Sequence, residues 1–275
     1  MGTRRIGLLA AAIACGMAWC ATGSAELNLW RSHHYAGEIN RGSGEYADAE
    51  TLLAEARQEH CRDRDEAHRL ASTLDRMGVT QMALDNYERS EKCLKCSLAL
   101  KEKELGPNSR HVPTTLNSLG DLYYITGQPD KAEAMYRRAL KLNERDQMNI
   151  EVCRGLNGLA LIRNGEGSYV EAEELLKRAI SIHERHLRRW HPYCATVYTN
   201  LGILYTNLGR FDEAEPRLEH AEYVQDKSLG TLHPDVALRL SAQAALYAKT
   251  DRHRKAARME GKAEAIRAHF AELNQ

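Results

Sequence analysis

The sequence has no excess of charge of either sign, because 38 lysine and arginine residues balance 38 aspartate and glutamate residues. No basic run or arginine-rich stripe stands out, so the composition argues against charge-driven nucleic-acid binding. Glycine-rich phosphate loops and the Gly-x-Ser-x-Gly elbow of hydrolases are missing as well. We therefore expect no catalytic residues and no cofactor, and we predict that the chain is not an enzyme.

Cysteine and histidine do not form a metal-binding pattern. Cys93-Leu-Lys-Cys96 has no second CxxC pair and no histidine directly after it, so neither a zinc site nor haem attachment is expected. We interpret the two cysteines as small apolar residues inside a helix, with a disulfide to Cys61 or another nearby helix as the alternative. The close pair His183-x-x-His186 lacks the metalloprotease pattern, so structural roles are favoured and no metal ligands are predicted.

Residues 1–25 differ from the rest of the chain. Arg4-Arg5 precede an apolar run from Ile6 to Trp19, and Gly23-Ser24-Ala25 supplies the small residues that signal peptidase prefers. The run is too short for a comfortable membrane span. We predict a secretory signal peptide at 1–25 with cleavage after Ala25, and therefore a periplasmic or secreted protein if the source is bacterial.

Lipid attachment is an alternative fate of this segment. Cys15 and Cys20 lie where a bacterial lipoprotein cysteine would lie, although the residues before each differ from the usual signal. Membrane association is expected only if one of them is lipidated. After cleavage an odd number of cysteines remains, namely Cys61, Cys93, Cys96, Cys153 and Cys194, and their pairing stays open.

The rest of the chain is organised by a pattern that recurs six times. In the third repeat it reads Leu116-x-x-Leu119-Gly120-x-x-Tyr123, followed by Gly127, Ala132, Tyr136 and Ala139. The column of small residues at the Gly120 position, here called the glycine column, contains Gly37, Gly78, Gly120, Ala160, Gly202 and Ala244. The Ala132 and Ala139 columns keep the same steps of 41, 42, 40, 42 and 42 residues. Such a period predicts tandem helical repeats.

Each unit has the periodicity of two amphipathic helices. Leu116, Leu119 and Tyr123 share one helix face, and Tyr136, Ala139 and Leu140 share another. The small residues are expected where helices approach most closely, because larger side chains would push the helix axes beyond the usual 8–10 Å or so. Turn glycines separate the two helices in four repeats, at Gly44, Gly127, Gly167 and Gly209. One pair cannot bury its apolar stripe alone, so the pairs must stack.

Three segments carry a family resemblance: Asn200-Leu-Gly-Ile-Leu-Tyr205, Leu208-Gly-Arg-Phe-Asp-Glu-Ala-Glu-Pro216 and Ser228-Leu-Gly-Thr-Leu-His-Pro-Asp-Val236. They resemble the tetratricopeptide repeat in its roughly 42-residue form, which occurs in kinesin light chains and many bacterial proteins. The resemblance covers about Leu29 to Phe270 and implies an all-α fold, a right-handed solenoid of about six antiparallel helix pairs.

The register divides the chain into a signal peptide, a solenoid at 26–270 and a C-terminal tail at 271–275. The expected repeat boundaries are 29–69, 70–111, 112–151, 152–193, 194–235 and 236–270. His191 and His233 each precede a proline in the linker between repeats, where Pro192 or Pro234 can begin the next helix.

Stacked pairs of this kind leave the first helix of each pair on the inner side. We predict a partner-binding groove formed there by Thr114, Asn117, Asp121 and Tyr124 in repeat three, by Arg154, Asn157, Leu161 and Asn164 in repeat four, and by Thr196, Thr199, Ile203 and Thr206 in repeat five, with Asn200 and Asn207 beside them. Amide side chains can both donate to and accept from a peptide backbone. The resemblance to kinesin light chain repeats also implies peptide binding.

A lysine and asparagine clamp for a terminal carboxylate, which some relatives have, is not expected. The matching positions hold Asp75, Asn117, Asn157 and Thr199, with no lysine among them. The predicted function is therefore an exported, non-catalytic scaffold or adaptor that binds a peptide or protein segment. A lipid-anchored or self-associating envelope assembly factor is the alternative, since the weaker sixth repeat can leave an apolar end for a second copy.

Overall fold

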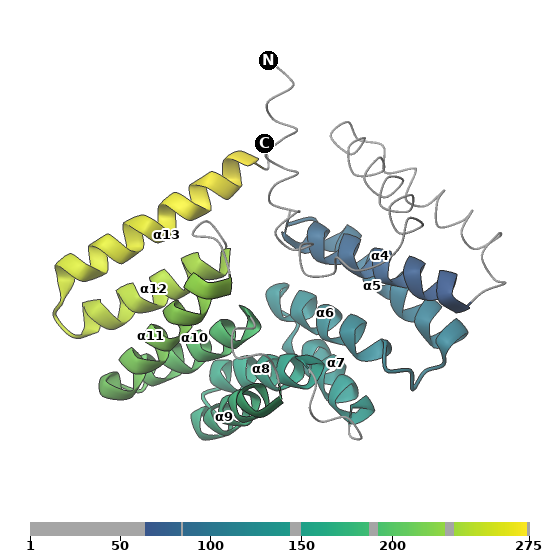
Figure 1. Ribbon diagram of the computed structural model, residues 1–275, viewed down its shortest axis with the longest axis horizontal. Helices are drawn as coiled ribbons and strands as arrows, with labels where there is room; N and C mark the ends of the chain where they lie inside the picture. Colours follow the sequence, from purple (N-terminus) through teal and green to yellow (C-terminus); the bar gives the residue numbers. More distant parts are fainter. Residues whose placement is uncertain (1–63, 84, 144–149, 187–191, 229–233, 274–275) are drawn as a thin grey trace, which may run out of the picture. The chain divides into compact units, whose positions relative to one another are not determined.

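The computed structural model describes residues 64–273 except 84, 144–149, 187–191 and 229–233 (Figure 1). The described residues form ten α-helices, α4 to α13, and one π-helical turn, η2, with no strand among them. The first helices of the successive pairs are α4 (Arg64–Ala83), α6 (Val112–Ile125), α8 (Ile150–Gly165), α10 (Pro192–Asn207) and α12 (Pro234–Lys249). The second helices are α5 (Tyr87–Leu100, continued by η2 at Lys101–Leu105), α7 (Pro129–Leu142), α9 (Tyr169–His186), α11 (Phe211–Ser228) and α13 (His253–Leu273).

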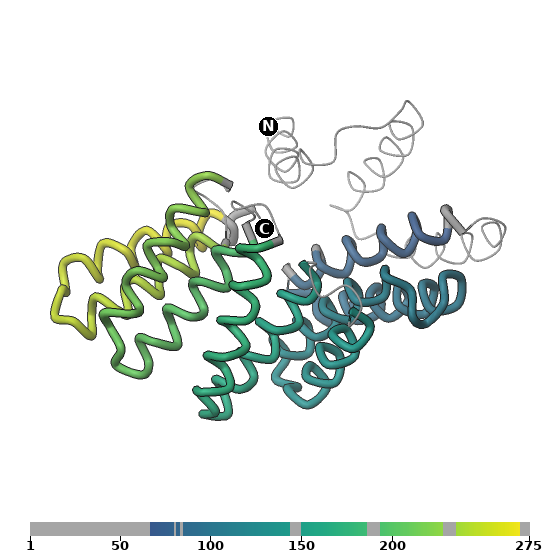
Figure 2. Tube along the Cα trace, turned by 60° about the horizontal axis from the view of Figure 1, so that its bottom comes forward, coloured from purple at the N-terminus to yellow at the C-terminus, as the bar shows by residue number. Residues whose placement is uncertain are grey.

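These helices lie in one compact unit, Asp63–Gln275, as five antiparallel pairs (Figure 2). The two helices of each pair pack along one another, and the second helices α5, α7, α9 and α11 also contact the first helix of the next pair. The predicted α-solenoid fold is confirmed. The signal peptide at 1–25 and nearly all of the first predicted repeat, 29–69, lie outside the described residues.

The helix bounds differ slightly from the predicted repeat boundaries. α4 already begins at Arg64, inside the predicted first repeat, and α8 begins at Ile150. Pro192 and Pro234 begin α10 and α12 as predicted, since proline fits the first turn of a helix, where its missing N–H costs no hydrogen bond. A separate tail was predicted at 271–275, but α13 continues to Leu273.

The glycine column lies where the two helices of a pair touch. A Cβ added at Gly120 would lie 2.5 Å from the Tyr136 ring, and one added at Gly202 would lie 2.6 Å from Leu218. Tyr136 and Leu218 occupy the same register position of their second helices, here called the stacking column, and both are buried. The predicted close approach is therefore present. In each of these two pairs, one large side chain of the second helix lies against the glycine of the first helix, where a Cβ would otherwise be.

The two alanine columns form the other side of this contact. Ala132 and Ala139 of α7 are fully buried, as are their equivalents Ala172, Ala179, Ala214 and Ala221. In α5 serines replace both alanines and remain buried. Ser90 donates to the Gly78 carbonyl and Ser97 to the Ala71 carbonyl, each at 2.8 Å. Because these hydroxyls are satisfied by α4, the substitution leaves no buried donor without a partner.

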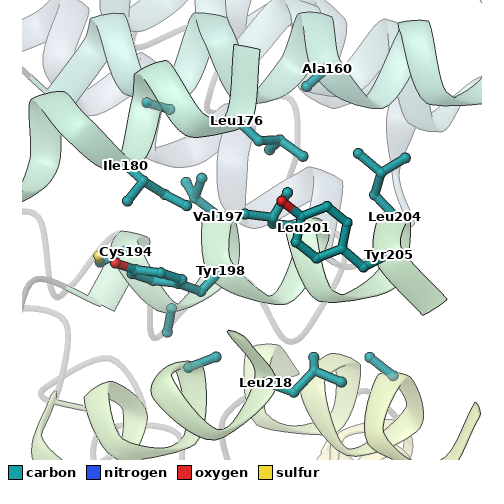
Figure 3. Close-up of a cluster of buried hydrophobic side chains, with 14 of the residues drawn as sticks. Ala160, Leu176, Ile180, Cys194, Val197, Tyr198, Leu201, Leu204, Tyr205 and Leu218 are labelled. Atoms are coloured by element: carbon teal, nitrogen blue, oxygen red, sulfur yellow. The ribbon is translucent and has the colours of Figure 1, made fainter. Parts of the chain in front are cut away.

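The largest buried cluster surrounds α10 (Figure 3). Figure 3 shows side chains of α10 such as Val197, Leu201 and Leu204 lying between Leu176 of α9 and Leu218 of α11. A first helix inside the stack is thus covered by its own partner and by the preceding pair. This explains why α10 is apolar on more than one face, unlike an isolated amphipathic helix.

The turns inside the pairs all use a left-handed backbone. Gly127, Gly167 and Gly209 have φ of 72°, 79° and 74°. The same register position is taken by Asp85 and Asp251, with φ of 58° and 57°. The sequence showed the glycines but not the two aspartates, which tolerate this conformation better than most side chains.

An acidic column joins neighbouring pairs. It contains Glu91, Glu133, Glu173 and Glu215, one residue after the first alanine column of each second helix. Each glutamate accepts a hydrogen bond from the next pair. Glu91 accepts from Tyr123 at 2.9 Å, and Glu133 accepts from Arg163. Glu173 accepts from Tyr205 at 3.0 Å and from Arg210 at 2.5 Å, and Glu215 accepts from Arg252 at 2.7 Å. The column therefore ties consecutive pairs together with charge-assisted hydrogen bonds.

Candidate partner-binding surface

A polar network joins α6, α7 and α8. Arg154 of α8 donates to Asp121 of α6 at 2.8 Å and to Glu151 at 3.3 Å. The Tyr136 hydroxyl of α7 donates to the other Asp121 oxygen at 2.8 Å. One guanidinium thus stands between two carboxylates, and most of its side chain is buried, with 20% exposed. The network fixes the spacing of neighbouring repeats.

The Arg154 guanidinium and two nearby phenols keep a single charge state at neutral pH. Burial lowers the pKa of Arg154, but the charges of Asp121 and Glu151 raise it more, so the guanidinium stays charged. Burial and the Asp121 charge raise the pKa of Tyr136, and they raise that of Tyr193 of α10 in the same way. Both phenols therefore remain neutral hydrogen-bond donors rather than proton-transfer groups.

The asparagines of the predicted groove lie between helices. Asn117 is fully buried and donates to the Glu151 carbonyl at 2.9 Å and to the Glu151 carboxylate at 2.8 Å. Its Oδ1 lies 3.4 Å from the place that a Cβ on Gly155 would take. Asn200 donates to Asn157 Oδ1 at 2.8 Å, which joins α10 to α8.

The expected exposure of this set is therefore corrected for four residues: Asn117, Asn157, Thr199 and Asn200 are buried. The physical reason is that the first helices of neighbouring pairs contact each other, so their facing sides become seams rather than open surface. Thr206 is buried too, and its hydroxyl donates to the Gly202 carbonyl at 2.8 Å. A direct role of these residues in binding a partner stays a prediction.

The remaining predicted residues keep part of their surface. Tyr124 is exposed at the end of α6, with 37% of the residue accessible, and Asn207 is exposed at the end of α10. Half-buried positions are Thr114, Asp121, Arg154, Leu161, Asn164, Thr196 and Ile203. Partial burial raises the pKa of the Tyr124 phenol, so it also remains a neutral donor. The structure brings Asp121 and Arg154 together, whereas Tyr124 and Asn207 belong to different pairs.

One row of this surface is mainly apolar. It consists of one residue from each first helix at the Asp121 register, namely Val79, Asp121, Leu161, Ile203 and Ala245. Val79 and Ala245 are exposed, and Leu161 and Ile203 are half-buried. We call it the first-helix row. Asp121, Leu161 and Ile203 belong to the predicted groove, and the repeat register adds Val79 and Ala245 to them.

A second polar cluster was missed by the sequence analysis. Asp75 of α4, Lys101 of η2 and Thr115 of α6 form a buried triangle, in which Lys101 pairs with Asp75 and Thr115 lies 2.8 Å from each. Lys101 is a lysine next to the clamp position Asp75, but its charge is paired with Asp75 inside the protein. A buried pair of this kind is more useful for fixing repeat geometry than for binding a carboxylate.

Two of the described cysteines lie in α5 and two are buried between helices. Cys93 and Cys96 lie inside α5 as predicted, and Cys96, Cys153 and Cys194 are free thiols in the structure. Burial raises the pKa of Cys153 to about 11 and that of Cys194 to about 12. The two buried thiols therefore stay protonated near neutral pH and pack as small apolar groups. Cys61 lies outside the described residues.

Comparison with known proteins agrees with this geometry. The tetratricopeptide repeat family matches residues 69–145, 151–222 and 193–268. The chain belongs to the tetratricopeptide repeat family.

Among curated proteins, it is 27% identical over 248 residues to Protein KINESIN LIGHT CHAIN-RELATED 1 of Arabidopsis thaliana, covering 89% of this chain and 40% of that protein. KINESIN LIGHT CHAIN-RELATED 2 of the same plant is 26% identical, covering 86% of this chain and 36% of the relative. The chain therefore spans less than half the length of these relatives.

A solved structure supports the same type of repeat. BtubC (BKLC) from P. vanneervenii superposes with a TM-score of 0.63 at 22% identity, covering 82% of this chain and 90% of that one. This tetratricopeptide repeat protein is thus of the kinesin light chain type, and its fold is that of a protein-interaction scaffold. Within the described residues, no helix is both long and apolar enough to cross a membrane.

Proposed function

We propose that this tetratricopeptide repeat protein is an exported binding module that holds an extended protein segment along the first-helix row without catalysing a reaction. The observation that carries the proposal is the first-helix row itself. Its apolar members stay partly accessible, although the residues directly before and after Leu161 and Ile203 are buried. Apolar side chains left at the surface in register favour a partner.

The spacing of the row suits an extended chain. Packed helices lie about 8–10 Å apart, and an extended segment advances about 3.3 Å per residue, so one residue in about three meets successive members of the row. Asp121 is already paired with Arg154, and the half-buried polar residues beside the row are largely uncharged. We therefore expect a partner segment with an apolar side chain at about every third position and few charges.

The test is a selection from a random peptide library on the full chain, followed by affinity measurements on variants. Replacing Val79, Leu161 and Ile203 together by aspartate should weaken the selected peptides at least about tenfold, because apolar contacts are replaced by charges that lose hydration on binding. The matched control replaces exposed apolar residues of second helices, Tyr169, Val170 and Tyr223, by aspartate.

The two variants separate the possible outcomes. Loss of binding in the first-helix variant with retention in the control supports the proposal. Equal binding by both variants, or selected peptides without the three-residue spacing, contradicts it. Circular dichroism of each variant checks that the helices remain folded.

Export is tested separately on the natural protein. Mass spectrometry of the mature chain from its native host should find Glu26 as the first residue, because cleavage is proposed after Ala25. A mature chain that still begins with Met1 contradicts export. A lipid on Cys15 or Cys20 supports the membrane-anchored alternative instead.

A further inference from the structure

The last described helix differs in charge from the other second helices. α5, α7, α9 and α11 each carry an acidic residue in the first turn, where it complements the positive end of the helix dipole. α13 has none there and begins His253-Arg254-Lys255. Cations at this end are disfavoured by the dipole, so the arrangement does not serve the stability of α13 itself.

The cations continue as a row along α13. Arg254, Arg258 and Lys262 follow one another at four-residue spacing, and all three are exposed. We call them the basic row. Lys255 lies beside it, 5.4 Å from the centroid of the Tyr247 ring. For the three residues of the basic row, no ion-pair partner occurs among residues that the structure describes. The row therefore presents concentrated positive charge to the outside.

A shallow row of small residues runs next to the basic row. Ala257, Gly261 and Ala265 are also four residues apart and exposed. A Cβ added at Gly261 would meet nothing within 4 Å. A helix is less stable with glycine than with alanine at an interior position, and no neighbour among the described residues requires a glycine here. Two neighbouring rows at four-residue spacing have the geometry of a ridge and a groove on a helix surface.

We propose that this outward face of α13 docks an acidic α-helix of a protein partner. The four-residue ridge of the incoming helix enters the groove at Ala257, Gly261 and Ala265, where missing side-chain bulk permits close approach. Carboxylates on the adjacent row of the partner then lie against the basic row and form charge-assisted hydrogen bonds. This contact is separate from the first-helix row and does not depend on the function proposed for it.

Charge alone would also attract a nucleic acid or an anionic lipid surface. Those ligands gain little from a narrow groove of small residues, because a flexible polyanion or a soft surface reaches exposed arginine and lysine side chains without entering it. The groove beside the basic row therefore favours a helix. The discriminating residue is Gly261, since its substitution changes the shape of the surface but not its charge.

The test uses the full chain and a fluorescent 21-residue peptide helix with a glutamate row beside a leucine row, each at four-residue spacing. Its affinity is measured by fluorescence anisotropy. Arg258→Glu with Lys262→Glu should lower the affinity at least about tenfold through charge reversal. Gly261→Leu should lower it at least about tenfold by filling the groove, while the thermal midpoint of the protein does not fall.

The matched control reverses two exposed arginines of α9, Arg178→Glu with Arg185→Glu, which changes the net charge equally. It should leave the affinity within about twofold. A peptide with lysine in place of every glutamate should not bind. The proposal is overturned if the glutamate peptide does not bind, if the lysine peptide binds equally well, or if Gly261→Leu has no effect. It is also overturned if heparin or phosphatidylglycerol vesicles bind the protein and Gly261→Leu changes neither their affinity nor that of the peptide.

Discussion

Single residues decide how closely the helices of a pair approach. Gly120 and Gly158 lie on two successive first helices, and the Tyr136 ring occupies the space next to both. The ring is held there by its hydrogen bond to Asp121, so it cannot move aside freely. The cost of a side chain in the glycine column therefore depends on how firmly the opposite residue is held.

Gly120→Ala is expected to lower the free energy of unfolding by about 1–3 kcal/mol, because its Cβ would overlap the buried Tyr136 ring. Gly165→Ala is the matched control, since a Cβ there meets nothing within 4 Å. It should be neutral or should add up to about 1 kcal/mol through better helix propensity. Urea unfolding of both variants measures the difference. Equal effects at the two positions would contradict this account.

The left-handed turn position gives a second prediction at this scale. Asp251→Gly should raise the free energy of unfolding by about 0.5–1 kcal/mol, because glycine adopts positive φ without strain. The Asp251 side chain is 97% exposed, so little else is lost. The reverse change, Gly209→Asp, should lower stability by a similar amount. Thermal unfolding of the pair tests the opposite signs.

At the scale of helices, neighbouring pairs are joined by the acidic column. Glu173 shows the most complete example, because it accepts from Arg210, Tyr205 and its own helix neighbour Lys177. The hydrogen bond from Arg210, together with those from Lys177 and Tyr205, outweighs the effect of burial and lowers the pKa of Glu173 to about 2 from its ordinary value of 4.5. A carboxylate with a lowered pKa makes stability depend on pH.

The sign of that dependence follows from the direction of the shift. The contribution of Glu173 is fully present above pH 4.5 and is lost as the pH falls toward about 2. Glu173→Gln should therefore cost about 1 kcal/mol at pH 7, a value kept small by solvent screening, and much less near pH 2. Urea unfolding across this range measures it. The same loss in the exposed neighbour Glu174→Gln, or a loss independent of pH, would contradict the role of the column.

The buried polar groups at the seams also belong to this scale. Asp75 with Thr115 joins repeats two and three, Asp121 with Arg154 joins three and four, and Asn157 with Asn200 joins four and five. Each seam has a different polar pair, so each has its own preferred register. Such pairs favour one alignment of neighbours over a slipped one, because a slip would leave buried groups without partners.

At the scale of the whole described unit, the last helix lacks the features that join earlier pairs. The stacking column reads Leu94, Tyr136, Leu176 and Leu218, all buried, and then Glu260 in α13. The acidic column ends in the same way, with Ala257 in place of glutamate. These positions of α13 therefore do not continue the apolar end expected at repeat six, and self-association of the chain stays a prediction.

Restoring the missing apolar residues should create such an end. Glu260→Leu with Glu264→Leu is expected to produce concentration-dependent association of the full chain, because leucines at one half-buried and one exposed position would continue the apolar side of the stack. Sedimentation velocity over a hundredfold concentration range, about 1–100 μM, measures it. Glu174→Leu with Glu219→Leu is the control, since both glutamates are exposed on other second helices. Association of the control to the same extent would show that surface leucines alone cause it.

The sequence by itself determined the repeat, the paired helices, the turn glycines and the family, because a period of 40–42 residues and a helical spacing of small and apolar side chains are local properties of the chain. It also gave Asp121, Arg154 and Tyr124 as surface positions. Only the tertiary structure decided that Asn117, Asn157 and Asn200 face seams, that Lys101 reaches Asp75, and that Asp251 takes the place of a turn glycine. Those features depend on which neighbouring repeat covers each helix face, and a polar residue at a seam has the same sequence spacing as one at a surface.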